Sequence, residues 1–237
     1  MAVAEPAAVK VLSGGAMRRF MAEAVPLFER RSGHTVNIRF ALTRVVKAEI
    51  EAGAAFDIAL LPRPAIEELV ISGKVAPGTA VDVVRSLVGL MVRTGTPAPD
   101  IGSIDKFKNL LRRAKSISYS TGPSGQYVGA LLERLGLAAE MKDKTVLAVG
   151  RPVGEVIASG EAEIGMQQII ENQPVKGAHL VGPLPETLGN YVPYTAGFPA
   201  GATENGAARA LLKFLASAEA VRIVREKGME PAQSSVD

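Results

Sequence analysis

Short apolar runs alternate with segments of helical spacing along the chain. The runs have the length of buried strands, and the segments between them carry apolar residues on one helical face. The pattern predicts strands at 9–14, 35–41, 56–62, 86–95, 116–121, 144–149, 162–169, 178–185 and 191–199. It predicts helices at 16–31, 44–52, 63–74, 125–135, 153–159, 205–216 and 218–227. Strands that alternate with helices indicate an α/β protein with largely parallel sheets flanked by helices.

Three residues define helix boundaries in this pattern. Pro26 lies inside the helix at 16–31 and should kink it or start it afresh, because proline lacks an N–H and clashes with the preceding turn. Thr43 is a suitable N-cap for the helix at 44–52, and Gly53 is a suitable C-terminal stop.

The composition is that of an ordinary globular protein with room for one large domain or two lobes. Of the 237 residues 47% are hydrophobic and 22% are charged. The net charge of +3, with 5% aromatic residues and no Trp, provides neither a basic stripe nor stacking platforms, so we expect no nucleic-acid partner. The lack of cysteine excludes disulfides and thiolate metal sites. No apolar run approaches the roughly 20 residues of a membrane span, so we expect a protein that is not membrane-embedded.

Small or hydroxyl residues occupy three strand-to-helix turns, at 13–17, 41–45 and 121–127. The N–H groups of a first helical turn have no partner within the helix and carry positive partial charge. Small residues also let a ligand approach the backbone closely. Turns of this kind that converge on one crevice would bind an anion. The alternative is that Ser, Thr and Gly at these positions are ordinary caps.

Three longer stretches resemble periplasmic solute-binding proteins of the molybdate-binding type, the receptors of ABC importers. They are FALTRVVKAEIEAGAAFDIAL, SGEAEIGMQQI and GFPAGATENGAARALLKFLASAEAVRIVREKGMEP, and the similarity spans nearly the whole chain. The resemblance implies the type 2 periplasmic-binding fold, in which two α/β lobes hold an oxyanion between them. Lobe one would take residues 1–82 and 196–237, and lobe two residues 83–195, with the ligand crevice between the lobes.

The departures from that family lie in the loops that hold its ligand. A run of Ala followed by Ser is replaced by SGGA at 13–16, a Ser-rich run by LTR at 42–44, and Pro-Ala-Gly by PSG at 123–125. Position 153 matches a residue whose backbone N–H is a ligand donor in that family. The Tyr of the family's ligand site falls at or close to position 168. The expected ligand-binding residues are therefore Ser13, Gly14, Gly15, Thr43, Arg44, Ser124, Gly125, Val153 and Gln168, with no metal and no cofactor.

Arg44 is the departure that changes the chemistry. Tetrahedral oxyanions are commonly held by neutral donors, whereas a guanidinium fork suits a carboxylate, and each charge-assisted hydrogen bond contributes about 1.5–3 kcal/mol. An arginine beside positive helix ends is unfavourable alone and becomes favourable when an anion lies between them. Arg44 therefore favours an organic carboxylate over molybdate. The alternatives are a solvated Arg44, or one paired with Glu49 or Asp57.

The other chemical patterns are weak. His34 and His179 are isolated, so neither indicates a metal site. Ser124 in GPSG lacks the full G-x-S-x-G pattern of a nucleophile, and SIDK at 103–106 is one chance Ser-x-x-Lys match. The acidic pair at positions 161 and 163 is typical of a solvated surface.

Three functions stay open. The first is a periplasmic, monomeric binding protein that delivers a small anion, an organic carboxylate before a molybdate-like oxyanion, to an ABC permease. The second is an isomerase on the same scaffold that acts on a tricarboxylate such as aconitate and needs a group to move a proton to and from carbon. The third is an orphan sensor or a partner of a membrane complex. Tyr127, Glu155 and Tyr191 are catalytic candidates by type only, so we assign no catalytic residue and expect binding without turnover.

The compartment depends on a segment that this sequence does not show. The first residues, MAVAEPAAVKVL, lack the charged and long apolar regions of a signal peptide. If the protein is exported to the periplasm, its signal peptide is missing from this chain.

Overall fold

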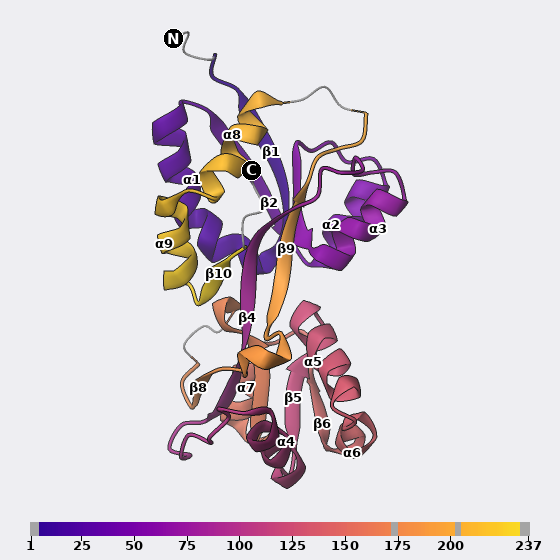
Figure 1. Ribbon diagram of the computed structural model, residues 1–237, viewed down its shortest axis with the longest axis vertical. Coiled ribbons are helices and arrows are strands. Elements are labelled where there is room, and N and C mark those ends of the chain that lie inside the picture. The colour runs from indigo at the N-terminus through magenta and orange to yellow at the C-terminus, as the bar shows by residue number, and fades with distance from the viewer. Residues whose placement is uncertain (1–4, 172–174, 202–204, 233–237) are drawn as a thin grey trace. The chain divides into compact units, whose positions relative to one another are not determined.

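The computed structural model describes residues 5–171, 175–201 and 205–232. The chain forms two compact units, one from Met1–Arg85 and Pro193–Asp237 and the other from Ser86–Val192. Each unit has a sheet with helices packed on it, and both sheets contain parallel strands, as the alternating pattern predicts (Figure 1). The predicted α/β class is therefore confirmed. No helix in the described part of the chain has the length and hydropathy that crossing a bilayer requires.

Unit 1 contains three parallel strands in the order β2 (Thr35–Ala41), β1 (Ala8–Gly14) and β3 (Ile58–Pro62). The return strand β9 (Tyr191–Gly197) runs antiparallel to β3, and the short β10 (Met229–Pro231) pairs with β4 (Val81–Arg93). The carboxyl ends of β1 and β2 coincide, because Gly14 pairs in register with Ala41. Each of these strands leads directly into a helix, through η1 (Gly15–Met17) in the case of β1.

Two groups of helices flank the strands of unit 1 (Figure 1). The first group is α1 (Arg18–Ser32), α8 (Gly206–Leu215) and α9 (Ala218–Glu226), and within it the rings of Phe28 and Phe214 lie 5.7 Å apart. The second group is α2 (Thr43–Glu51) and α3 (Arg63–Ile71). Ile50 and Leu69 from this second group form a core with Leu12 of β1. Strands β1 and β3 are thus largely buried beneath apolar helix faces, as parallel strands require, whereas the edge strand β2 alternates between exposed and half-buried residues.

Unit 2 is built around β7 (Ile164–Gln168), which pairs antiparallel with β4 and parallel with β5 (Ile117–Ser120). Strand β6 (Thr145–Ala148) pairs parallel with β5, and β8 (Ala178–Pro183) pairs antiparallel with β4. The helices are α4 (Ile104–Arg113), α5 (Pro123–Arg134), the short α6 (Ala138–Met141) and α7 (Val153–Ser159). Short 3-10 turns complete the unit at η2 (Lys142–Lys144), η3 (Ile169–Glu171) and η4 (Glu186–Leu188).

Several expected boundaries are wrong. Pro26 lies within α1, which continues through it, because the apolar face that includes Phe20 and Phe28 packs along the whole helix. Thr43 is the first residue of α2 and Leu42 is the N-cap, without a side-chain capping bond. Strand β4 begins at Val81, before the predicted position 86. The sequence pattern also gave no sign of α4 or of β10.

Candidate functional site

The expected ligand-binding residues are divided between the two units. Ser13, Gly14, Gly15, Thr43 and Arg44 belong to unit 1, at the ends of β1 and β2. Ser124, Gly125, Val153 and Gln168 belong to unit 2, at the starts of α5 and α7 and the end of β7. Both sets lie at the carboxyl ends of parallel strands, which is where open α/β sheets bind ligands.

Gly14 and Thr43 are neighbours at the carboxyl edge of unit 1. A Cβ placed on Gly14 would lie 3.6 Å from Thr43 Oγ1 and 3.3 Å from Tyr194 Cε1. Tyr194 is almost fully buried on β9 and was not singled out by the sequence, since an aromatic residue in an apolar strand has the signature of a core residue. Gly14 thus packs close to Tyr194 and Thr43, and a side chain at this position would crowd both of them.

Ser13 and Gly15 differ in exposure although they flank the same turn. Ser13 is fully buried, and its Oγ donates to the carbonyl oxygen of Gly14 at 3.3 Å. Gly15 is exposed at the start of η1. The structure thus brings Gly14 and Thr43 together, whereas the Ser13 hydroxyl already has an acceptor in its own turn.

Arg44 is exposed on the first turn of α2. The two acids considered as its partners are bound elsewhere. Glu49 Oε2 accepts from Arg39 Nε at 2.8 Å, and Asp57 accepts from the Lys10 N–H at 2.7 Å and from Asn205 Nδ2 at 2.9 Å. Within the part of the chain that the structure describes, Arg44 forms no hydrogen bond and no ion pair.

Three other arginines at strand-to-helix turns have partners, namely Arg18, Arg63 and Arg151. The guanidinium of Arg18, at the start of α1, lies 4.7 Å from the centroid of the Phe40 ring. Arg63, the first residue of α3, pairs with Asp82, whose other carboxylate oxygen accepts from Thr195 Oγ1 at 2.6 Å. An arginine beside a positive helix end is thus compensated at these turns, whereas none of the described residues provides such a partner for Arg44.

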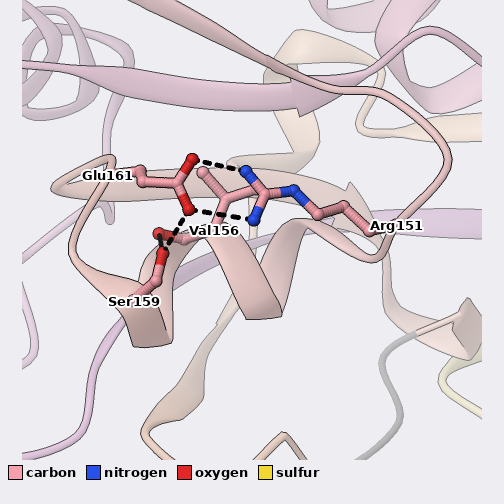
Figure 2. Close-up of polar contacts among 4 residues, drawn as sticks. All are labelled: Arg151, Val156, Ser159 and Glu161. Carbon is pink, nitrogen blue, oxygen red and sulfur yellow. Dashed lines mark hydrogen bonds and ion pairs between the residues drawn. The ribbon is translucent and has the colours of Figure 1, made fainter.

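Arg151, two residues before α7, is held most firmly of these arginines. Figure 2 shows both Nη atoms of its guanidinium facing the two carboxylate oxygens of Glu161. Arg151 Nη1 donates to Glu161 Oε1 at 2.9 Å. Ser159 Oγ also donates to Glu161 Oε1 at 2.7 Å. Hydrogen bonds from Arg151 and Ser159 lower the pKa of Glu161 to about 2. Glu161 therefore has a specific partner, in place of the solvated surface role that the sequence indicated.

Close packing defines the first turn of α5. A Cβ on Gly125 would fall 1.6 Å from the carbonyl oxygen of Ser120, so this position requires glycine. Ser124 is fully buried, and its Oγ lies 3.2 Å from Ser120 Oγ, which also accepts the Gly122 N–H at 3.2 Å. The GPSG segment thus packs the helix onto the end of β5, and the described partner of Ser124 is another hydroxyl and not a base.

Val153 and Gln168 both lie beside Gln167, a residue that the sequence analysis did not name. The Val153 N–H, which was expected to face a ligand, donates to Gln167 Oε1 at 3.1 Å. Gln168 is fully buried, and neither Nε2 nor Oε1 of its amide meets hydrogen-bond geometry with a described residue. The amide of Gln167 thus occupies the backbone donor that was expected to face a ligand.

Glu171 completes this group at the end of η3. Gln167 Nε2 donates to Glu171 Oε2 at 3.3 Å. Burial raises the pKa of Glu171, and the amides of Gln167 and Gln168 offset part of that shift. The position of Glu171 after an apolar strand was the only signal in the sequence, and an acid there is more often exposed.

The catalytic candidates taken from the sequence gain little support. Tyr127 Oη donates to the carbonyl oxygen of Leu188 at 3.4 Å, and burial raises the pKa of Tyr127 to about 12 in spite of nearby Arg134. It therefore keeps its proton at neutral pH and is a poor base. Glu155 is exposed on α7, and Tyr191 is half-buried on β9.

The weak patterns have structural explanations. His34 is buried and its Nδ1 accepts the Ala7 N–H at 3.2 Å. In SIDK, Ser103 is the N-cap of α4 and accepts the Lys106 N–H at 3.3 Å. No group of three or more His, Asp or Glu side chains among the described residues could hold a metal ion.

The comparisons with known proteins agree with this architecture. Residues 9–230 match the family model of bacterial extracellular solute-binding proteins. The chain is 33% identical over 227 residues to an aconitate isomerase of Pseudomonas sp., covering 93% of this chain and 87% of that protein. It is 26% identical over 215 residues to the molybdate-binding protein ModA of Rhodobacter capsulatus, covering 85% of this chain and 80% of that protein.

Solved structures show the same fold at lower sequence identity. The periplasmic molybdate-binding protein of Azotobacter vinelandii superimposes with a TM-score of 0.71 at 19% identity, covering 95% of this chain and all of that one. The expected resemblance and the periplasmic-binding-protein-like fold are thereby confirmed. From the family match and these relatives, the chain belongs to the bacterial extracellular solute-binding proteins and is of their molybdate-binding type.

Proposed function

We propose that this solute-binding protein takes a small organic carboxylate, with Arg44 as the cation that selects it. The protein would act on the periplasmic side of the membrane as a monomer and deliver its ligand to an ABC permease. The proposed contacts are those expected from the sequence: Ser13, Gly14, Gly15, Thr43 and Arg44 in one unit, and Ser124, Gly125, Val153 and Gln168 in the other.

The observation that carries the proposal is that Arg44 forms no hydrogen bond and no ion pair with any residue that the structure describes. The other three turn arginines with described contacts have an aromatic ring or a carboxylate as partner, and both acids considered for Arg44 are bound to other groups. The N–H groups of the first turn of α2 add positive partial charge beside it. A bidentate arginine–carboxylate contact matches the planar fork, whereas the molybdate anion is tetrahedral.

The comparisons give a second, independent reason to favour an organic acid as the ligand. The relative at 33% identity acts on aconitate, which is a tricarboxylate, whereas the molybdate-binding relative reaches 26%. The more similar of these two proteins is thus the one whose substrate carries carboxylates. A molybdate-like oxyanion is the second ligand class.

A thermal-shift screen over oxyanions and di- and tricarboxylates tests the ligand class. A carboxylate present at 100 times its dissociation constant should stabilise the protein by about 2.7 kcal/mol. Molybdate, tungstate and sulfate at the same concentration should stabilise it less. Stabilisation by molybdate with no effect of any carboxylate would contradict the proposal.

A second candidate function is isomerisation of a tricarboxylate, and the aconitate isomerase relative is the observation that favours it. Such a reaction takes a proton from one carbon and returns it to another. Glu171 is the described acid whose raised pKa suits that transfer best, but among the residues that the structure describes it forms no ion pair that would complete an acid–base pair. We therefore expect binding without turnover.

Chromatography of trans-aconitate incubated with the protein separates the two functions. The binding function predicts that cis-aconitate appears no faster than without protein. Sustained conversion that is lost in both Arg44→Gln and Glu171→Gln would establish the isomerase. Conversion that persists in both variants would come from a contaminating enzyme.

A further inference from the structure

Leu42 exposes an apolar side chain at the turn between β2 and α2. The residue is 63% exposed, and it is not among the described residues of the core between β1, α2 and α3, whereas its neighbour Ala41 packs against that core. The backbone of the turn is fixed, because the Leu42 carbonyl oxygen accepts the N–H groups of Val45 at 2.8 Å and Val46 at 3.0 Å. The exposure of Leu42 is therefore a property of an ordered turn.

Leucine is also an unfavourable residue for the N-cap of α2. Side chains that accept a hydrogen bond from the first turn are preferred at this position, and Leu42 makes no such bond. Met17 and Leu137 are apolar N-caps as well, but both are fully buried, so packing explains them. Leu42 thus provides neither a cap nor a residue of the core.

The residues on both sides of Leu42 lie next to the turn that follows β1. A Cβ on Gly15 would lie 3.7 Å from the Ala41 carbonyl oxygen, and a Cβ on Gly14 would lie 3.6 Å from Thr43 Oγ1. Leu42 therefore lies at the carboxyl edge of unit 1, among the ligand-binding residues proposed for that unit.

Arg44 follows Leu42 by two residues and is exposed on the same turn. An organic acid and an inorganic oxyanion differ in what this pair of side chains offers them. Molybdate and sulfate present only oxygen atoms, so an apolar side chain has nothing to pack against. An organic acid carries hydrogen-bearing carbon atoms beside its carboxylate, and their removal from water against a leucine is favourable.

We propose that Leu42 is a specificity-determining residue that contacts the hydrocarbon part of the ligand while Arg44 binds its carboxylate. This assignment rests on the proposed carboxylate ligand and narrows it to acids that carry CH2 or CH groups next to a carboxylate. Leu42 adds affinity for such acids and none for inorganic oxyanions. It also adds none for oxalate, which has two carboxylates and no hydrogen-bearing carbon.

Calorimetric titration with two acids tests this contact. The probes are tricarballylate, whose carboxylates are joined through CH2 and CH groups, and oxalate, whose affinity is measured by competition with tricarballylate. Leu42→Ala and Leu42→Gln should each bind tricarballylate about three- to tenfold more weakly than wild type, because the apolar contact is lost. Both should bind oxalate within about twofold of wild type. Leu42→Met keeps an apolar side chain of similar volume and should bind both acids within about twofold of wild type.

Ile71→Ala is the matched control. Ile71 is 87% exposed and is the last residue of α3, in the same unit. Because α3 begins at the carboxyl end of β3, Ile71 lies at the far end of the helix from that edge. Ile71→Ala should bind both acids as wild type does. All four variants should unfold within about 2 °C of wild type, since both positions are exposed.

The outcomes separate this contact from the proposed function. Tight binding of tricarballylate that is unchanged in Leu42→Ala and Leu42→Gln would overturn the role of Leu42 and leave the carboxylate function standing. Equal losses for tricarballylate and oxalate would overturn it as well, because Leu42 would then act only through the shape of the turn. So would a loss in Ile71→Ala as large as that in Leu42→Ala. If wild type binds no carboxylate, the proposed function fails and this assignment fails with it.

Discussion

The turns that open α2 and α7 use their polar groups in opposite ways. At α2 the guanidinium of Arg44 is exposed and has no described partner, while Thr43 lies next to the small residue Gly14. At α7 the Val153 N–H is bound by Gln167, and Arg151 is bound by Glu161. The first turn has charge available for a ligand, whereas the second has its charge neutralised within the unit.

The difference assigns a separate task to each turn. A free cation supplies affinity for an anion of any shape and steers it toward the site. Neutral buried donors supply discrimination, because a ligand that leaves them unpaired is penalised. Unit 1 would therefore provide charge, and unit 2 would provide shape and hydrogen-bond selectivity. Substitution of Arg44 should then act on binding, whereas substitution of the packed or internally bonded groups at the α5 and α7 turns should act mainly on stability.

The largest effect should come from the packed turn of α5. Gly125→Ala places a Cβ 1.6 Å from the Ser120 carbonyl oxygen, so backbone must move, and we expect a loss of about 3 kcal/mol or more in the free energy of unfolding. Gly129→Ala on the same helix meets nothing within 4 Å and should be neutral or stabilising by up to about 1 kcal/mol. Denaturant unfolding measures both variants. Equal unfolding free energies of Gly125→Ala and Gly129→Ala would show that the first turn of α5 is not close-packed.

An intermediate effect should come from Gln167. Gln167→Met keeps the approximate volume but leaves the Val153 N–H without its acceptor and removes the Gln167 amide as a donor to Glu171. We expect a loss of about 1–3 kcal/mol in unfolding free energy. Gln126→Met, at an exposed position of α5, should change it by less than about 0.5 kcal/mol. A Gln167→Met protein as stable as wild type would mean that this turn is not held by the amide.

The smallest effect concerns the exposed pair of Arg151 and Glu161. The pKa of Glu161 falls from its ordinary value of 4.5 to about 2 in the folded protein, so the pair stabilises the fold above pH 4.5. That stabilisation is lost as the pH falls from 4.5 toward 2, because Glu161 then takes up a proton in the folded state. Glu161→Gln should remove this part of the acid transition, followed by circular dichroism, whereas Glu155→Gln should leave it unchanged. An unaltered transition in Glu161→Gln would show that the pair contributes nothing.

The sequence predicted the α/β class because apolar periodicity reports burial directly. Strand β7 and helix α2 were recognised for this reason. The pattern failed where a long-range contact overrides a local rule. Packing carries α1 through Pro26, and Leu42 occupies the cap position that Thr43 was expected to fill.

The sequence pointed to some groups of the candidate site and missed others. Arg44 could be noticed because a cation at a helix start conflicts with the helix dipole. Gln167, Glu171 and Tyr194 could not, because their roles depend on contacts across the fold that no spacing in the sequence encodes. The sequence also did not reveal the partner of Arg151, because Glu161 lies ten residues later in the chain, after the end of α7.

The central claim is that Arg44 is a ligand group and the other turn arginines are structural. The most direct test is calorimetric titration of the preferred carboxylate into wild type, Arg44→Gln and the matched control Arg63→Gln, whose arginine is paired with Asp82. Arg44→Gln should bind at least tenfold more weakly, a loss of about 1.4 kcal/mol, with an unfolding free energy close to that of wild type. Arg63→Gln should bind within about threefold of wild type. Carboxylate affinity unchanged in Arg44→Gln, together with tight binding of molybdate by the wild type, would contradict the claim.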